Sequence, residues 1–350
     1  MKVLEIIPTL NKIGGGETFF TDLCIKMNKK VKLFVVVLYK SNNNFLNKLI
    51  KESGIEIIYL NKKRGIDIRC AHELRKAISL FKPDVIHCHL RSLLTLRLSF
   101  LFKRKIPIFF TVHNIFGENF KNEWLDSILI RKRFVIPVGV CNEVSKSIKR
   151  HTGVDSRTIY NGLNVEKYDA GKKINERTID FIVVGSFYYL KNQIYAIKCF
   201  ERIAETNPNL NIHFLGDGSD LTVCKEYVKT KNIKNVYFHG VVNNVNEFLA
   251  DSKILLLPSL TEANPICVHE AIVSGCYIIS NNVGGVGELV NKRNGKLVRI
   301  NDYESFCTAM LSSINDNYLL EETRKYSEET RESHSINYSL LQYLDLFKDF

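Results

Sequence analysis

The feature that most constrains this chain is an alternation of short apolar runs with amphipathic stretches. In the first half, apolar and β-branched runs fall at residues 2–8, 31–38, 54–60, 84–87, 106–112 and 135–140. Amphipathic stretches lie between them at residues 18–29, 71–81, 92–102 and 124–133. Strands that are apolar throughout and alternate with helices are typical of a parallel sheet covered on both faces.

The second half repeats this pattern. Its apolar runs are 179–185, 210–216, 236–239, 254–258 and 276–280, and its amphipathic stretches are 193–205, 221–229, 245–251 and 266–274. Residues 160–173 between the halves are rich in turn formers and lack periodicity, as a linker does. The pattern predicts two doubly wound α/β domains, residues 1–172 and 173–350, facing each other across a cleft, with the C-terminal helix able to pack back on the first.

Size and hydropathy narrow the class of protein. A chain of 350 residues is too long for one ordinary core and suits two domains. The mean hydropathy is −0.07, and the apolar runs are far shorter than the roughly 20 residues that a membrane span needs. Because Glu5 interrupts a short apolar N-terminus, we expect no signal peptide and a cytoplasmic protein.

The nine cysteines are scattered, and no pair has Cys-x-x-Cys spacing. This usage favours reduced thiols over disulfides. His87, Cys88 and His89 could suggest a metal site. We expect none, because successive strand residues point to opposite faces and no second ligand cluster is visible in the sequence.

The charge is distributed unequally between the halves. Residues 1–172 contain 31 basic and 15 acidic residues, a net charge of +16, whereas residues 173–350 contain 18 and 22, a net charge of −4. Such asymmetry indicates that the first half faces an anionic partner such as a phospholipid surface, a phosphorylated substrate or nucleic acid. Nucleic acid is disfavoured because no nucleic-acid-binding motif accompanies the charge.

Two loops of the first half follow predicted strands and carry candidate functional residues. Gly14, Gly15 and Gly16 precede Glu17 and a helix, so they permit a tight turn at a helix N-terminus that can bind an anion. His113 follows the strand at 106–112, where catalytic groups gather in α/β sheets. The glycines match neither the Walker A nor the dinucleotide-binding spacing.

The second half offers glycine turns of the same kind. Gly185 and Ser186 end one strand, and Lys191 follows at a helix start, where it could bind phosphate. Gly216 and Gly218 end the next strand.

The most specific pattern is a pair of glutamates, Glu262 and Glu270, separated by seven residues around a helix start at Pro265. Two carboxylates beside unpaired helix N–H groups can bind hydroxyl pairs and phosphate oxygens in one pocket. A ligand that is both polyhydroxylated and phosphorylated matches them, which indicates a sugar nucleotide.

These motifs together resemble family 4 of the retaining glycosyltransferases, which have the GT-B fold of two Rossmann-like domains. The resemblance spans roughly residues 1–300. It rests on Glu-x7-Glu, the Gly-Gly-Gly-Glu turn, Gly-Ser…Lys-Asn, and three further matches: Asp84-Val85-Ile86-His87, Tyr160-Asn161-Gly162 and Gly284-Gly285-Val286-Gly287-Glu288. Where this family commonly has Gly-Arg, the chain has Gly185-Ser186, so the arginine's share of diphosphate binding must be absent or supplied from elsewhere.

The resemblance implies three catalytic residues, His113, Glu262 and Lys191. His113 would contact the sugar near the anomeric centre, Glu262 the face on which positive charge develops, and Lys191 the diphosphate. The implied donor-binding residues are Gly15, Gly16, Ser186, Lys191, Asn264, Pro265, Ile266, Cys267 and Glu270. Glu270 would hold the ribose hydroxyls, and backbone N–H groups of residues 264–267 the sugar hydroxyls and phosphate.

The resulting hypothesis is a retaining hexosyltransferase that moves a sugar from a nucleotide diphosphate donor, with UDP favoured by family habit, to a glycan or lipid-linked acceptor of a cell-surface polysaccharide such as capsule or lipopolysaccharide. We expect it to need no metal or other cofactor, because no Asp-x-Asp occurs in the chain. Two alternatives remain: a sugar-nucleotide epimerase of the same fold and a non-catalytic nucleotide-sugar-binding protein.

The basic excess predicts peripheral docking of the first domain on the inner face of an anionic membrane. Three basic groups support it: Lys62-Lys63-Arg64, Lys103-Arg104-Lys105 and Arg131-Lys132-Arg133. The third ends a stretch in which Trp124, Leu125, Ile128 and Leu129 are spaced to share a helix face. Aromatic and aliphatic residues beside lysine and arginine suit the membrane interface.

Overall fold

The structure is a computed structural model that describes residues 1–11, 14–99, 106–117, 120–169 and 172–350. For residues 120–122 it describes the backbone only. It divides into two compact units, which we treat separately. Unit 1 comprises residues 1–162 and 336–350, and unit 2 comprises residues 163–335. No helix within the described ranges is long and apolar enough to cross a bilayer. All nine cysteines lie within those ranges and are free thiols.

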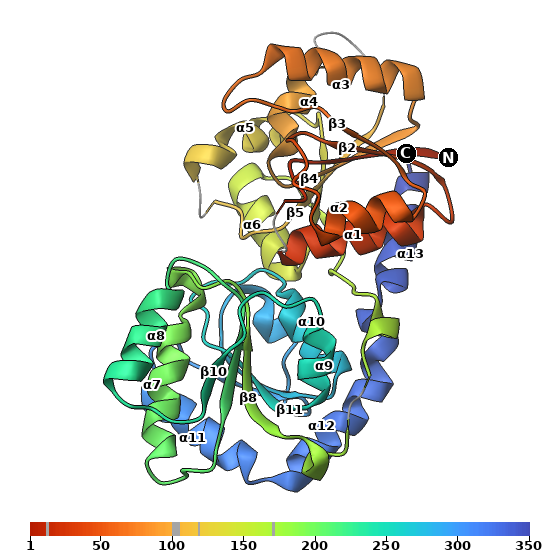
Figure 1. Ribbon diagram of the computed structural model, residues 1–350. Helices are drawn as coiled ribbons and strands as arrows, with labels where there is room; N and C mark the ends of the chain where they lie inside the picture. Colours follow the sequence, from red (N-terminus) through yellow and green to blue (C-terminus); the bar gives the residue numbers. More distant parts are fainter. Residues whose placement is uncertain (12–13, 100–105, 118–119, 170–171) are drawn as a thin grey trace. The chain divides into compact units, whose positions relative to one another are not determined.

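Unit 1 is a parallel sheet covered by helices on both faces (Figure 1). Its strands are β1 (Lys2–Ile7), β2 (Lys32–Val37), β3 (Glu56–Tyr59), β4 (Val85–His89), β5 (Ile108–Val112), β6 (Ile136–Gly139) and β7 (Arg157–Thr158). Its helices are α1 (Gly15–Met27), α2 (Phe45–Glu52), α3 (Ile68–Phe81), α4 (Leu93–Ser99), α5 (Phe120–Arg131), α6 (Asn142–Thr152) and α13 (Ile336–Lys348).

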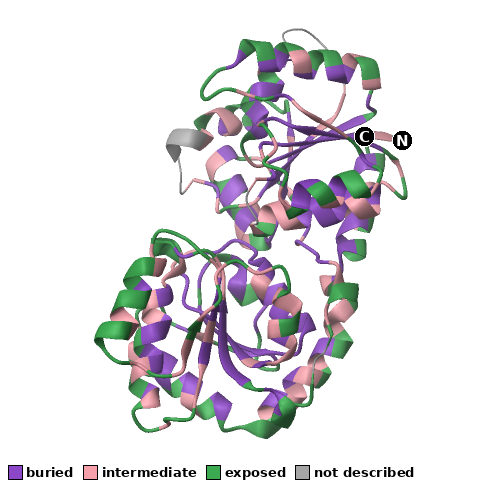
Figure 2. Ribbon diagram, in the orientation of Figure 1, coloured by how far each residue is buried: buried purple, intermediate pink, exposed green. Residues whose placement is uncertain are grey.

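The strand order in this sheet is β3-β2-β1-β4-β5-β6-β7, so β1 and β4 are central neighbours. Their register pairs Glu5 with His87. Figure 2 shows the strands buried and the outer faces of the helices exposed, as expected when helices cover both faces of a sheet. The apolar side chains of the strands form the core of the unit.

The C-terminal helix α13 belongs to unit 1, although it follows unit 2 in the sequence. It lies beside α1 in Figure 1. Its buried side chains include Tyr343 and Phe347, whose rings face His87 of β4 at centroid distances of 4.8 and 5.4 Å. The last 15 residues therefore complete the cover of the first sheet.

Unit 2 contains a second parallel sheet in the order β10-β9-β8-β11-β12-β13. Its strands are β8 (Ile179–Val184), β9 (Ile212–Leu215), β10 (Val236–Phe238), β11 (Ser252–Leu257), β12 (Tyr277–Asn281) and β13 (Gly295–Val298). Its helices are α7 (Gln193–Ala204), α8 (Leu221–Thr230), α9 (Val245–Ala250), α10 (Ile266–Val273), α11 (Tyr303–Ile314) and α12 (Asn317–Thr330).

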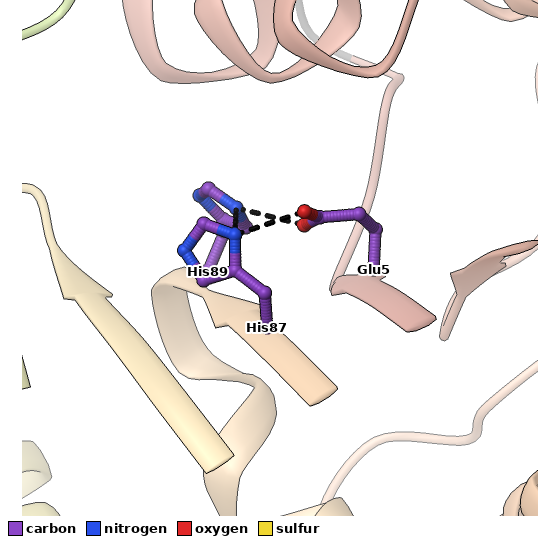
Figure 3. Close-up of side chains that lie close together, drawn as sticks. All are labelled: Glu5, His87 and His89. Carbon is purple, nitrogen blue, oxygen red and sulfur yellow. Dashed lines mark hydrogen bonds and ion pairs between the residues drawn. The ribbon is translucent and has the colours of Figure 1, made fainter. Parts of the chain in front are cut away.

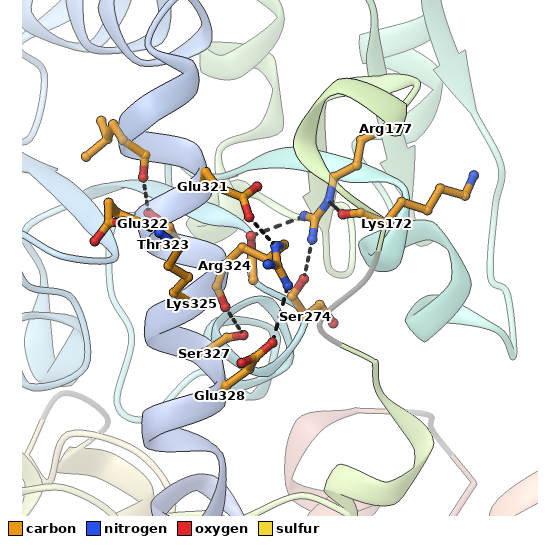
Figure 4. Close-up of polar contacts among 12 residues, drawn as sticks. Lys172, Arg177, Ser274, Glu321, Glu322, Thr323, Arg324, Lys325, Ser327 and Glu328 are labelled. Atoms are coloured by element: carbon orange, nitrogen blue, oxygen red, sulfur yellow. Dashed lines mark hydrogen bonds and ion pairs between the residues drawn. The ribbon is translucent and has the colours of Figure 1, made fainter.

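Polar contacts fasten the entry of unit 2 to its sheet (Figure 4). The buried Arg177 guanidinium donates to the carbonyls of Lys172, Ser252 and Ser274, at 3.1, 2.5 and 2.9 Å. On the surface of α12, Arg324 pairs with Glu321 and Glu328 one turn away. Among the acceptors of Arg177, the Ser274 carbonyl lies at the C-cap of α10, where the helix itself leaves it without a partner.

The predicted architecture of two parallel-sheet Rossmann-like domains is confirmed. The sequence reading missed α2, α6 and the short strand β7. In α6, Val144, Ser147, Ile148 and Thr152 form the buried stripe, and only two of the four are strongly apolar. The sequence reading also named no elements after residue 280, where β13 and helices α11 to α13 lie.

Candidate functional site

In unit 2, the loops after β8 and β11 bring Lys191 and Glu262 together. Lys191 Nζ donates to Glu262 Oε1 at 2.5 Å, and the Glu262 side chain is 8% exposed. Burial acts to lower the pKa of Lys191, but the carboxylate beside it outweighs this and raises the pKa above its ordinary value. Lys191 therefore remains a cation at neutral pH, with further N–H donors available to a ligand.

Glu270 lies in the helix that follows Glu262. Helix α10 begins after Pro265, and Glu270 is largely buried in its second turn, where its Oε1 accepts from the Tyr168 hydroxyl at 2.6 Å. The hydrogen bond from Val268 N to the Pro265 carbonyl is 3.1 Å long, and the preceding N–H groups of Ile266 and Cys267 have no intrahelical acceptor. Carboxylate and helix start are therefore near neighbours, as the sequence predicted.

Pro265 needs a correction. Sequence reasoning counted the whole segment 264–267 as N–H donors, but proline has no N–H. The donors are those of Asn264, Ile266 and Cys267, and Pro265 contributes the fixed backbone of the helix N-cap, with φ −71°.

Sequence reasoning missed a histidine pair that holds this loop in place. His269 Nε2 contacts Asn264 Oδ1 at 2.5 Å, and His269 Nδ1 contacts His334 Nδ1 at 2.8 Å. Burial, with His334 nearby, holds the pKa of His269 well below its usual range, and burial lowers the pKa of His334 to about 4. Both rings are therefore neutral at pH 7. His269 follows Cys267 by two residues, but nothing in its spacing indicates a partner 65 positions away.

Two glycine turns lie against each other at the ends of β8 and β9. A Cβ on Gly216 would come within 2.1 Å of the Gly185 carbonyl oxygen, and one on Gly218 within 2.1 Å of the Phe187 carbonyl oxygen. These glycines are therefore required by close backbone approach. Ser186 is exposed, and its carbonyl accepts from Gln193 Nε2 at 2.8 Å.

In unit 1, the structure brings the predicted glycine turn and His113 together. Gly15 opens α1, and a Cβ on Gly16 would lie 3.8 Å from His113 Nδ1. His113 follows β5 and is partly buried, with Nε2 3.1 Å from His89 Nδ1. Burial, together with His89 and His87, holds the pKa of His113 well below its usual range, so the ring is neutral.

Behind His113 lies a group that the sequence reading underestimated. Glu5, His87 and His89 are fully buried and hydrogen-bonded to one another (Figure 3). The argument from opposite faces was wrong for this pair, because residues two apart share a face and only Cys88 points away. The sequence did contain a signal for this group: Glu5 is a charge inside an apolar strand, and a second predicted strand carries His-x-His.

The side-chain types of this group also bind metal ions, and their ligating atoms lie within 4.8 Å of one another. Burial acts to raise the pKa of Glu5, but the charge and hydrogen bonds of His87 and His89 lower it to about 2. Burial, together with His87, lowers the pKa of His89 to about 4. The two histidines therefore keep the buried carboxylate ionised.

The basic groups named in the sequence differ in their surroundings. Arg131, Lys132 and Arg133 are exposed at the end of α5, beside exposed Trp124 and Ile128. Leu129 is buried, so the predicted apolar stripe divides into a face toward the core and a face toward solvent. Of the group at 62–64, Lys63 and Arg64 are exposed and Lys62 is half-buried, close to exposed Ile66 and Ile68. Lys103, Arg104 and Lys105 lie outside the described residues.

Comparison with known proteins covers both units. Residues 13–167 match the profile described as Glycosyltransferase Family 4, and residues 164–333 that described as Glycosyl transferases group 1. The capsular polysaccharide biosynthesis glycosyltransferase CapH of Staphylococcus aureus is 28% identical over 81% of this chain and 82% of its own length. The UDP-Gal:alpha-D-GlcNAc-diphosphoundecaprenol alpha-1,3-galactosyltransferase of Escherichia coli is 27% identical over 78% of this chain and 81% of its own.

Solved structures show the same fold. Anabaena Alr3699/HepE in complex with UDP-glucose superposes with a TM-score of 0.86 at 16% identity, over the full length of both chains. TarM superposes with a TM-score of 0.81 at 14% identity, over 99% of this chain and 98% of its own.

Proposed function

Since this chain belongs to the family-4 type of glycosyltransferases with the GT-B fold, we propose that it transfers a hexose-type sugar from a UDP-sugar to a lipid-linked or glycan acceptor, with retention of configuration. The observation that carries the proposal is the Lys191–Glu262 pair, 2.5 Å apart, which joins the loop before α7 to the loop before α10 and Glu270. This set of a cation, two carboxylates and helix N–H groups suits a ligand with both phosphates and hydroxyls.

The proposed chemistry follows from where charge develops. As the bond between sugar and diphosphate breaks, negative charge grows on the diphosphate, and the Lys191 ammonium and the N–H groups at the start of α10 stabilise it. Positive charge grows on the sugar, and the Glu262 carboxylate stabilises it. Glu270, oriented by Tyr168, accepts hydrogen bonds from the ribose hydroxyls. In family 4 the acceptor hydroxyl attacks from the side of the leaving group and gives its proton to a phosphate oxygen of the departing diphosphate. The new C–O bond therefore forms on the face where the old one broke, which retains the configuration.

The acceptor and biological role are inferred from relatives. The E. coli relative acts on a sugar diphosphoundecaprenol, and the S. aureus relative is a capsular polysaccharide enzyme. A lipid-linked acceptor in the synthesis of a cell-surface polysaccharide is therefore proposed here too. The UDP-glucose complex of HepE supports UDP as the nucleotide.

A panel of nucleotide sugars tests this function. We expect one donor to raise the thermal midpoint, because a ligand at 100 times its dissociation constant adds about 2.7 kcal/mol of stability. With that donor and a polyprenyl-diphosphate sugar, we expect a glycoside with the donor's anomeric configuration by NMR. An inverted product would contradict retention, an epimerised donor without acceptor would indicate an epimerase, and binding without any turnover would indicate a non-catalytic protein.

We also propose that unit 1 docks on the inner face of an anionic membrane. Trp124, Ile128 and Phe134 are 54, 43 and 50% exposed, beside the basic residues 131–133 at the end of α5. Each lysine or arginine near an anionic surface contributes about 1 kcal/mol, and exposed aromatic and aliphatic side chains add interfacial burial. The net charge of −4 on residues 173–350 offers no comparable attraction.

Co-sedimentation with phosphatidylglycerol vesicles at moderate and high salt tests the docking. We expect binding that weakens with salt and in the double variant Trp124→Ser, Ile128→Ser. Val223→Ser is the control, since Val223 is 60% exposed on α8 of unit 2. Equal binding to phosphatidylcholine, or none to anionic vesicles, would reject the docking and point to a soluble acceptor.

A further inference from the structure

A chain of buried hydrogen bonds runs through unit 1 and ends at His113. Glu5 lies at its centre, on strand β1, and is fully buried. Glu5 Oε2 is 3.1 Å from His89 Nε2, and the other nitrogen of that ring, Nδ1, is 3.1 Å from His113 Nε2. His89 therefore lies between a buried carboxylate and the ring that follows β5.

A second arm leads from Glu5 to the C-terminal helix. Glu5 Oε1 is 2.9 Å from His87 Nδ1, and His87 Nε2 is 2.8 Å from Thr111 Oγ1. Thr111 Oγ1 is in turn 2.9 Å from the hydroxyl of Tyr343 on α13, a fully buried side chain. This arm ends at Tyr343, three hydrogen bonds away from Glu5.

The direction of the hydrogen bonds follows from counting protons. An ionised carboxylate only accepts, so His89 must present Nε2–H to Glu5. A neutral imidazole carries one proton, so His89 Nδ1 has a lone pair and must accept from His113 Nε2–H. His113 is then left with its lone pair on Nδ1, the atom that lies toward Gly16.

We propose that Glu5 and His89 are positioning residues that hold His113 in its Nε2–H tautomer and turn the Nδ1 lone pair toward the glycine turn at the start of α1. His113 then acts there as an acceptor for a substrate hydroxyl, not as a cation for the diphosphate. The kinetic consequence rests on the proposed function. The tautomer itself does not, so the two can fail separately.

The tautomer can be measured without any substrate. In full-length protein labelled with ¹⁵N-histidine, two-bond ¹H–¹⁵N spectra at neutral pH distinguish protonated from unprotonated ring nitrogens. His113→Gln assigns the signals. We expect His113 with protonated Nε2 and unprotonated Nδ1. Protonated Nδ1, or protons on both nitrogens, would overturn the proposal.

Variants of His89 separate positioning from packing. His89→Gln keeps one donor for Glu5 and one acceptor for His113, whereas His89→Leu keeps neither. We expect the glutamine variant to preserve the His113 tautomer and the leucine variant to lose it. With the donor found in the transfer assay, kcat should fall at least about 10-fold in His89→Leu, at nearly unchanged donor KM. Loss of the group that fixes a catalytic histidine's tautomer lowers kcat in the same way in serine proteases.

Tyr343→Phe is the matched control at the far end of the chain. It removes one buried hydroxyl from unit 1 without touching His89, so the His113 signals should not change. If Tyr343→Phe and His89→Leu alter kcat equally, the effect is one of general stability and the proposal fails. A stoichiometric transition metal that Glu5→Gln releases would also overturn it, because His89 Nε2 would then be a ligand and not a donor.

Discussion

The two units share one topology and place their polar groups differently. In both sheets the first strand lies between the second and the fourth, in the orders β3-β2-β1-β4 and β10-β9-β8-β11. In unit 2 the charged residues of the site, Lys191 and Glu262, lie in loops beyond the strand ends. The central strands of unit 2 do carry an ion pair, Asp180 of β8 with Lys253 of β11 at 2.8 Å, but it lies at the strand starts and not at the site. In unit 1, by contrast, Glu5 and its histidine partners lie within the strands themselves.

This difference has consequences for both stability and function. Lys191 is 21% exposed, and a residue in these loops can be substituted with little change in the core when its hydrogen bond is kept. A charge within a central strand cannot, because its partners are left buried and unpaired. We therefore expect substitutions in unit 2 to change catalysis and binding, and those in unit 1 to change stability as well.

The largest effect is expected for Glu5→Leu. Removing the carboxylate leaves two buried imidazole donors without their acceptor, and each buried donor left unsatisfied costs about 1–3 kcal/mol. Hydrogen exchange of β1 and β4 in the full chain measures this loss locally. Glu56→Leu is the control, because Glu56 is an exposed acid on the edge strand β3. If Glu5→Leu lowers the free energy of unfolding by less than about 1 kcal/mol, the buried charge of unit 1 matters no more for stability than a surface charge, and the two units do not differ in this respect.

Glu262→Gln is expected to act on turnover alone. The role proposed for it is to stabilise charge that exists only in the transition state, so kcat should fall by about 100-fold while the donor KM stays nearly constant. Thermal unfolding should be close to that of the parent, since the amide oxygen of the introduced glutamine can still accept from Lys191. Glu226→Gln, at an exposed position on α8, should leave all three quantities unchanged. Wild-type kinetics in Glu262→Gln would mean that this carboxylate lies outside the reaction.

Glu270→Ala should instead weaken donor affinity. A hydrogen bond to a charged group contributes about 1.5–3 kcal/mol, so the dissociation constant measured by calorimetry should rise at least about 10-fold. Tyr168→Phe removes only the group that orients Glu270 and should weaken binding by about threefold. Tyr318→Phe, an exposed tyrosine on α12, serves as the control. If turnover falls at unchanged affinity in Glu270→Ala, the roles of the two carboxylates must be exchanged.

The sequence was informative about functional side chains in the loops that follow the strands. Glu262, Glu270 and Lys191 could be predicted as candidates because turn residues and a helix start mark the loops that carry them. The contact of Tyr168 with Glu270 could not be predicted, since it joins positions 102 residues apart through the linker segment. Such a contact depends on tertiary packing, about which periodicity carries no information.

The sequence was least informative inside the strands of unit 1. Glu5 entered the argument only as a charge in a short apolar segment, although the register places it opposite His87. That register requires β1 and β4 to be neighbours, although many residues separate the two strands in the chain. The parallel sheet could be predicted from apolar runs, but the pairing that makes a buried carboxylate and two histidines into one group could not.

The smallest effect is expected from removal of divalent metal, and this experiment examines both units together. In unit 2, we propose that Lys191, which stays a cation, and the N–H groups at the start of α10 neutralise the diphosphate, so transfer should not need Mg²⁺ or Mn²⁺. In unit 1, hydrogen bonds among Glu5, His87 and His89 account for their ligating atoms. We therefore expect the transfer rate to stay within about twofold after dialysis against EDTA, with the thermal midpoint unchanged. Loss of transfer that Mn²⁺ restores, at an unchanged midpoint, would place a metal at the diphosphate. A fall in the thermal midpoint that Zn²⁺ reverses would instead place a metal ion at Glu5. An ion there would stabilise the protein because it binds the folded state and not the unfolded chain.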